Sequence, residues 1–251
     1  MARIIPARRG RRRRGRWRET LALLIIVAIG AGVAWLYVHD ARSQESAAVP
    51  SGRPTGGTPP ATPAYDVARR ELEALPVKGW DRFEDFDRAR FGEPWSDDVN
   101  VEFGHNGCNT RDDILRRDLV DLQVRPGTCF AQHGILHDPY TGSTIVFDRG
   151  PGTSSAVQID HVVALSDAWY KGARLWDDQR RLDFANDPRN LLAVDGRVNF
   201  DKAFRDAASW LPPNVAFRCP FVARQVEVKT DYQLWVSGRE KDAMRQVLRG
   251  C

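Results

Sequence analysis

The chain has 251 residues, of which 42% are hydrophobic and 28% charged, enough for one sizeable globular domain with appendages. Its formal net charge of +4 is concentrated at one end, because nine of the 37 Lys and Arg residues lie within residues 1–20. The rest of the chain is slightly acidic, which excludes a general polyanion-binding surface. Any contact with nucleic acid must therefore come from a local patch.

An uncharged apolar run at residues 21–38, LALLIIVAIGAGVAWLYV, directly follows the basic N-terminal tail. A helix of this length is roughly long enough to cross the core of a bilayer, and flanking arginines keep the N-terminus in the cytoplasm. A cleaved signal peptide is the alternative, although the nearest small-x-small site, Ser46-x-Ala48, lies far downstream. The chain therefore divides into a basic cytoplasmic tail at 1–20, a transmembrane signal anchor at 21–38, a Pro/Gly/Ser/Thr linker at 39–63 and an exported domain at 64–251.

The exported part contains four cysteines, Cys108, Cys129, Cys219 and Cys251. No pair has the C-x-x-C spacing of a zinc site, so we expect no structural zinc. An even number of cysteines in an exported protein favours disulfides. Among the three pairings we favour Cys108–Cys129 and Cys219–Cys251, because each pair brackets one local segment; buried free thiols are the alternative.

In chain order, the residue pattern of the exported part predicts two helices, then short strands, then three more helices. Residues 64–77 have apolar residues at helical spacing, and so do residues 109–122, where Thr110 and Asp113 have the spacing of a capping box. Strands are expected on both sides of the turn in residues 134–150, at residues 156–159 and at residues 190–194. The last three helices are expected at 195–211, from Pro220 through residue 229, and from the capping box of Ser237 and Glu240 to Gly250.

A set of polar residues interrupts the apolar pattern of the two last strands and the following helix. Asp160 and His161 end one strand, Asn190 opens the next, and Asn199 and Lys202 share one face of the helix. Two antiparallel strands followed by a helix can bring Asp160 beside the first turns of that helix. The oxygens of Asp160 and Asn199 would suit Mg²⁺ or Mn²⁺, and His161 can accept a proton from water near neutral pH.

These segments, IDHVVAL and NLLAVDGRVNFDK, resemble the ββα-metal motif of HNH endonucleases. More widely, residues 80–251 resemble exported actinobacterial HNH nuclease-like proteins, whose nuclease domain is similar to the C-terminal part of GmrSD-type restriction enzymes. The resemblance implies an α+β fold in which a ββα-metal (HNH) core is embedded in a mostly helical domain with a small antiparallel sheet, here after an N-terminal transmembrane helix. It also implies a metal-dependent DNA endonuclease; RNA is the second candidate substrate.

The same resemblance assigns roles to the five polar residues. Asp160 takes the first metal-ligand position, His161 the general base, and Asn190 the asparagine that braces the backbone around the base. Asn199 takes the last ligand position, where many members have histidine, and Lys202 matches a basic residue that can face phosphate.

Two arginines are further candidates for binding phosphate. Arg149 lies on the Gly-rich loop before the Asp-His strand, where a structural ion pair is the alternative, and Arg197 lies close to the motif. The sequence departs from the shortest HNH motifs by a long insertion at residues 166–188, and it lacks the nucleotide-binding half of GmrSD enzymes. Two other functions stay open: an inactive envelope-associated binding protein with an HNH-like fold, and a hydrolase of another phosphodiester.

Overall fold

The structure of the protein, a computed structural model, describes residues 65–80 and 85–251. The predicted tail at 1–20, membrane span at 21–38 and linker at 39–63 lie outside the described residues. Within those residues, no helix has the length and apolar character that crossing a membrane requires. All of them fall within one compact unit.

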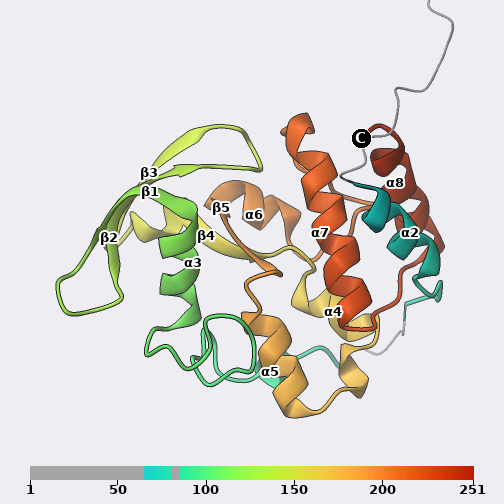
Figure 1. Cartoon of the computed structure of the whole chain (residues 1–251), viewed down its shortest axis with the longest axis horizontal. Helices are drawn as coiled ribbons and strands as arrows, with labels where there is room; N and C mark the ends of the chain where they lie inside the picture. The colour runs from blue at the N-terminus through green and yellow to red at the C-terminus, as the bar shows by residue number, and fades with distance from the viewer. Residues whose placement is uncertain (1–64, 81–84) are drawn as a thin grey trace, which may run out of the picture. The chain divides into compact units, whose positions relative to one another are not determined.

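The strands form two separate antiparallel sheets (Figure 1). The larger sheet has the order β1-β2-β3 and consists of β1 (Leu119–Val124), β2 (Ala131–His137) and β3 (Thr144–Asp148). The smaller sheet pairs β4 (Val157–His161) with β5 (Leu191–Asp195), so that His161 lies opposite Leu191. The predicted hairpin and the next two strands are therefore confirmed, as is the α+β class.

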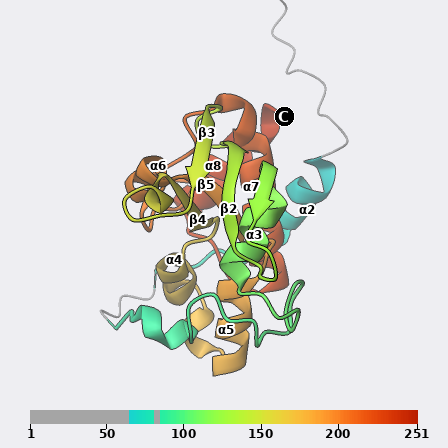
Figure 2. The same ribbon diagram turned by 90° about the vertical axis from the view of Figure 1, so that its left-hand side faces the viewer.

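The described residues also form α-helices. They are α2 (Asp66–Ala74), α3 (Thr110–Asp118), α4 (Leu165–Tyr170), α5 (Asp178–Asn186), α6 (Gly196–Lys202), α7 (Arg218–Asp231) and α8 (Gly238–Arg249). Helices α2, α7 and α8 pack together at the far side of β5 from the larger sheet (Figures 1 and 2). The capping box of Ser237 and Glu240 is present at the start of α8, as predicted.

Three of the predicted helices are too long, and the first of them, expected at 64–77, covers only Asp66–Ala74. Helix α3 ends at Asp118, and the residues that follow it pair with β2 as strand β1. Its cap is Asn109, whose side chain accepts a hydrogen bond from the backbone of Asp112, so the capping box predicted at Thr110 is wrong. The helix predicted at 195–211 ends at Lys202, because Ala203 adopts a φ of 51° that a right-handed helix cannot contain. The insertion at 166–188 folds mainly into α4 and α5.

Strand β5 is buried on both faces, which fixes the antiparallel pair of β4 and β5 from two sides. Leu192 and Val194 pack into the core that α2, α7 and α8 share, whereas Leu191 and Ala193 pack into the core between α3 and the larger sheet. This alternation follows from the two-residue period of a strand. The backbone that carries the polar residues at the ends of these two strands is therefore rigid.

Both disulfides are formed in the pairing that the sequence favours. Cys108–Cys129 joins the loop before α3 to the connection between β1 and β2, and Cys219–Cys251 joins the start of α7 to the second residue after α8. Each links segments that are far enough apart in sequence for the bond to restrict the unfolded chain appreciably.

A cluster of five buried charged residues connects several of the helices. Lys171 lies 2.5 Å from Asp167, 2.9 Å from Asp206 and 2.7 Å from Glu240. Lys229 lies 2.8 Å from Asp167 and 3.0 Å from Glu240. Helices α4, α7 and α8 and the segment after α6 thus meet in this cluster.

Candidate active site

Asp160 and His161 at the end of β4 and Asn199 on α6 line one open cleft. The cleft has a volume of about 530 Å³ and its walls also include Trp95, Arg88 and other residues from segments before β1. Helix α6 follows β4 at a distance in the sequence. The antiparallel pairing of β4 with β5 nevertheless brings α6, which directly follows β5, alongside β4. The three residues that the sequence placed around one reaction are therefore brought together.

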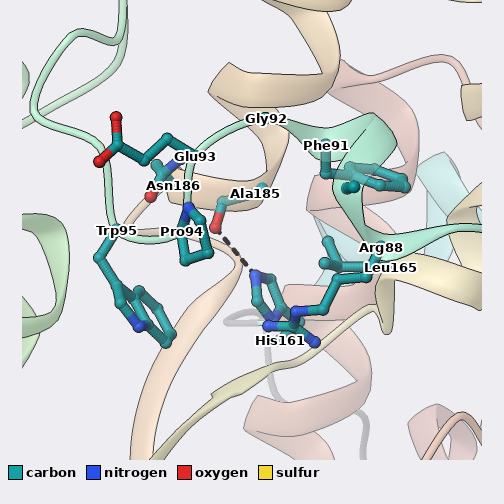
Figure 3. Close-up of a pocket in the computed structure, with 11 residues that line it drawn as sticks. Arg88, Phe91, Gly92, Glu93, Pro94, Trp95, His161, Leu165, Ala185 and Asn186 are labelled. Atoms are coloured by element: carbon teal, nitrogen blue, oxygen red, sulfur yellow. Dashed lines mark hydrogen bonds between the residues drawn. The ribbon is translucent and has the colours of Figure 1, made fainter.

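The His161 side chain is buried and has one nitrogen committed to the backbone. Its Nε2 lies 2.8 Å from the carbonyl oxygen of Ala185, and the indole of Trp95 stacks on the ring at 6.1 Å between centroids (Figure 3). Because a carbonyl oxygen only accepts, Nε2 carries the proton of the neutral ring. Nδ1 has no hydrogen-bond partner in the described part of the chain and keeps its lone pair. Burial, helped by the charges of Arg88 and Lys202, lowers the pKa of His161 to about 3.

This depressed pKa predicts that His161 makes the fold less stable in acid. Below about pH 6.5 the unfolded chain binds a proton at this side chain, whereas the folded chain binds it only near pH 3. Falling pH favours the state that binds more protons, so stability should fall by up to about 1.4 kcal/mol per pH unit within this window. The stability of the wild type relative to His161→Phe, measured by urea unfolding, should decrease from pH 7 to pH 4.5. A difference that is independent of pH would contradict the shift.

Buried polar side chains hold the backbone that carries His161. The Asn190 amide accepts from the N–H of Val163 at 2.8 Å and donates to its carbonyl at 3.2 Å. Gln225 on α7 donates to the carbonyl of Val162 at 2.9 Å, and the Lys202 ammonium donates to that of His161 at 2.8 Å. The chain after β4 is therefore fixed at three successive residues.

Asp160 is buried and both of its carboxylate oxygens accept hydrogen bonds. The Tyr140 hydroxyl donates to Oδ2 at 2.5 Å, and the Lys202 ammonium donates to Oδ1 at 3.0 Å. Burial raises the pKa of Asp160, while Lys202 and Tyr140 oppose that effect. Burial and the neighbouring carboxylate also raise the pKa of Tyr140 well above its usual value, so its hydroxyl stays a donor.

Asp160 and Asn199, the two predicted ligands, both line the cleft and carry oxygens of the type that binds a hard cation. Asn199 donates its Nδ2 to the side-chain oxygen of Gln158 at 3.0 Å, which leaves its own oxygen available as an acceptor. Among the described residues, no group of three or more His, Cys, Asp and Glu could hold a metal ion. The oxygens of Asp160 and Asn199 are of the type that suits a cation such as Mg²⁺, which keeps several waters and takes further oxygens from a phosphate.

Two of the three predicted phosphate-binding residues interact with other groups of the protein instead. Lys202 is completely buried, and its ammonium is occupied by Asp160 and the carbonyl of His161, so the prediction that it faces phosphate is wrong. Arg149 forms an ion pair with Asp112 and donates to the carbonyl of Ala131 at 2.6 Å. This is the structural ion pair that the sequence offered as the alternative to phosphate binding. Arg197 is exposed in the first turn of α6.

The structure instead places Arg88 and Arg111 in the cleft. Neither guanidinium makes a hydrogen bond or ion pair with another described residue, and Arg88 lies beside His161 (Figure 3). Burial and the nearby charge of Arg149 lower the pKa of Arg111, which means that its charge is poorly compensated. Nothing in the sequence distinguishes these two arginines, because they lie far from the motif in a chain rich in arginine.

Comparisons with known proteins cover the same region. Residues 109–247 match the family described as "GmrSD restriction endonucleases, C-terminal domain". The chain is also 36% identical over 196 residues to an "uncharacterized secreted protein" of Arthroderma benhamiae, an alignment that covers 77% of this chain and 89% of that protein. No solved structure matches the chain. The matched family region includes β4, β5 and α6, whereas Arg88 and Trp95 lie before it.

Proposed function

Because the chain belongs to the family of GmrSD restriction endonuclease C-terminal domains, we propose that it is an exported endonuclease that hydrolyses phosphodiester bonds in DNA with one divalent metal ion and His161 as general base. One observation carries the assignment of the base. His161 is a neutral imidazole with Nε2 held by a carbonyl and Nδ1 open, in a cleft with two arginines that have no described partner.

In this proposal, Nδ1 of His161 accepts the proton of the attacking water. A pKa near 3 makes a weak base, but an anionic phosphodiester in the cleft stabilises the imidazolium and raises the pKa of His161 toward neutrality. Asn190 keeps the backbone of the base fixed. Arg88 and Arg111 bind the non-bridging oxygens and stabilise the charge that develops on them.

Asp160 and Asn199 would hold the metal ion. When bound, it supplies positive charge to the phosphate oxygens and to the leaving oxygen. Lys202 offsets the charge of Asp160 at 3.0 Å, which weakens the carboxylate's attraction for a second cation. We therefore propose that the ion binds weakly to the free protein and more tightly with the substrate, whose oxygens complete its ligand set.

The variant Asn199→Ala tests this ligand set. It removes one neutral oxygen and leaves His161 in place, so the metal concentration for half-maximal cleavage should rise by about tenfold or more, and Asp160→Ala should have a larger effect. Titration of the cleavage rate with Mg²⁺ and Mn²⁺ measures this. Asn100→Ala, outside the cleft, is the matched control. Coincident titration curves for Asn199→Ala and the wild type would show that Asn199 does not bind the metal.

A substrate panel tests the function as a whole. The full-length protein, purified in detergent, is incubated with DNA, RNA and wall-polymer phosphodiesters, each with Mg²⁺ or with EDTA. We expect cleavage of DNA that EDTA abolishes. Cleavage of the wall polymer alone would identify another phosphodiester hydrolase, and binding without cleavage of any substrate would identify an inactive binding protein.

We further propose that residues 21–38 anchor the exported domain to the membrane. The secreted relative and the two disulfides support export, and the uncharged run after nine arginines supports an anchor. In fractionated cells, a C-terminally tagged chain should appear at full length in membranes, with its tag accessible to external protease. A shortened secreted form would favour a signal peptide, and a cytoplasmic protein would refute export.

A further inference from the structure

Exposed aromatic rings lie beside the cationic cleft. Phe204, which lines the cleft just after α6, is 59% exposed, and Phe200 on α6 is 81% exposed. Burying such rings is normally favourable, so leaving them in water costs stability. Phe204 thus adds an exposed apolar ring to the cleft that carries the charges of Arg88 and Arg111.

A second, smaller pocket opens from the other side of His161. It has a volume of about 270 Å³ and shares Arg88, Trp95, His161 and Leu165 with the cleft. Trp95, Pro94 and Phe91 line it, and all three are labelled in Figure 3. We call it the side pocket. Its walls are mainly apolar, and its size suits one planar ring system.

Two details of the side pocket lower the stability of the fold. Trp95 has a φ of 61°, a left-handed conformation that is rare for a bulky residue, and a hydrogen bond from the N–H of Thr110 to its carbonyl at 3.2 Å helps to hold it there. Asn186, also in the wall, has a buried side-chain oxygen without a hydrogen-bond partner in the described part of the chain. Strained backbone and unpaired buried polar groups cluster at ligand sites.

We propose that the cleft binds a single, unpaired nucleic acid strand, with one base stacked on Phe204 and the base beside the scissile phosphate in the side pocket. This deepens the proposed function and rests on it for the identity of the scissile phosphate. Proteins that bind single strands combine a positive groove with aromatic platforms, because every unpaired base offers a flat face. In a duplex the base faces are stacked on one another and cannot reach Phe204 or Trp95 unless a base leaves the helix.

Binding of labelled DNA by the full-length protein in EDTA separates strand preference from cleavage. We expect the single strand to bind at least about tenfold more tightly than its duplex with a full complement. With Mg²⁺ restored, cleavage should follow the same order. An abasic nucleotide beside the preferred cleavage position of the single strand should slow cleavage there. Equal cleavage of strand and duplex, unaffected by the abasic site, would overturn the proposal and leave the nuclease assignment intact.

Phe204→Ala tests the stacking platform, with Leu175→Ala as its control. Leu175 is an apolar residue of similar exposure, 72%, that lies outside the cleft. Phe204→Ala should weaken binding of the single strand at least about fivefold and leave binding of the duplex unchanged, and Leu175→Ala should change neither. Unchanged binding of the single strand would refute the platform. Tight single-strand binding without cleavage of any nucleic acid would refute the nuclease but retain the strand site.

Discussion

Replacing His161 by alanine is expected to slow the cleavage of DNA by about 10²–10⁴-fold, the range that a positioned general base contributes. The variant keeps Asp160 and Asn199, so its dependence on metal concentration should match that of the wild type. Single-turnover rates at saturating metal measure the effect on the chemical step.

The control for this experiment is His133→Ala. His133 is a histidine of β2 whose ring lies 2.7 Å from Asp148, outside the cleft, and its replacement should leave the rate unchanged. Because the ring of Trp95 stacks on His161, thermal unfolding must show that His161→Ala remains folded at the assay temperature. A folded His161→Ala protein that cleaves at nearly the wild-type rate would falsify the assignment of the base.

The core of the site could be predicted from sequence because its signals are local. Asp160 and His161 end a strand with clear apolar alternation, and Asn190 lies at the entrance to the next strand, where its amide can reach back to the backbone after His161. The short connection from β5 to α6 then fixes where Asn199 lies. The two-residue period of a strand and a three-residue helical spacing are both encoded over a few residues. The pairing of β4 with β5 spans the connection that contains α4 and α5, and it follows from the resemblance to the ββα-metal motif.

The remaining features of the site depend on contacts between distant segments. Arg88 and Trp95 reach His161 from more than sixty residues before it, and nothing in their own neighbourhood distinguishes them. The inward position of Lys202 was missed for another reason. Helical spacing places Lys202 near Asn199, but only the end of α6 at Ala203 and the burial of Asp160 decide that its ammonium forms an ion pair instead of facing solvent.

The variant Lys171→Met is expected to destabilise the fold by about 3–5 kcal/mol. Lys171 is fully buried and lies within 3.0 Å of three carboxylates, on Asp167, Asp206 and Glu240. Methionine has a similar volume, so the core stays filled. Asp167 and Glu240 keep Lys229 as an ion-pair partner, whereas Asp206 loses the ion pair that it makes in the described cluster. A loss of this size is a large fraction of the 5–15 kcal/mol that stabilises a typical domain.

The pH dependence of this loss separates charge from packing. Burial already raises the pKa of Glu240, and removing Lys171 should raise it further. The folded variant then binds a proton that the unfolded chain releases above about pH 4.3, so its stability should rise as the pH falls from 7 to 5. The difference in stability between wild type and variant, from urea unfolding, should therefore shrink over this range. Lys78→Met, at an exposed lysine over the ring of Trp235, should cost no more than about 1 kcal/mol at either pH. An equal loss at pH 5 and pH 7 would attribute the effect to packing instead of to the unpaired acids.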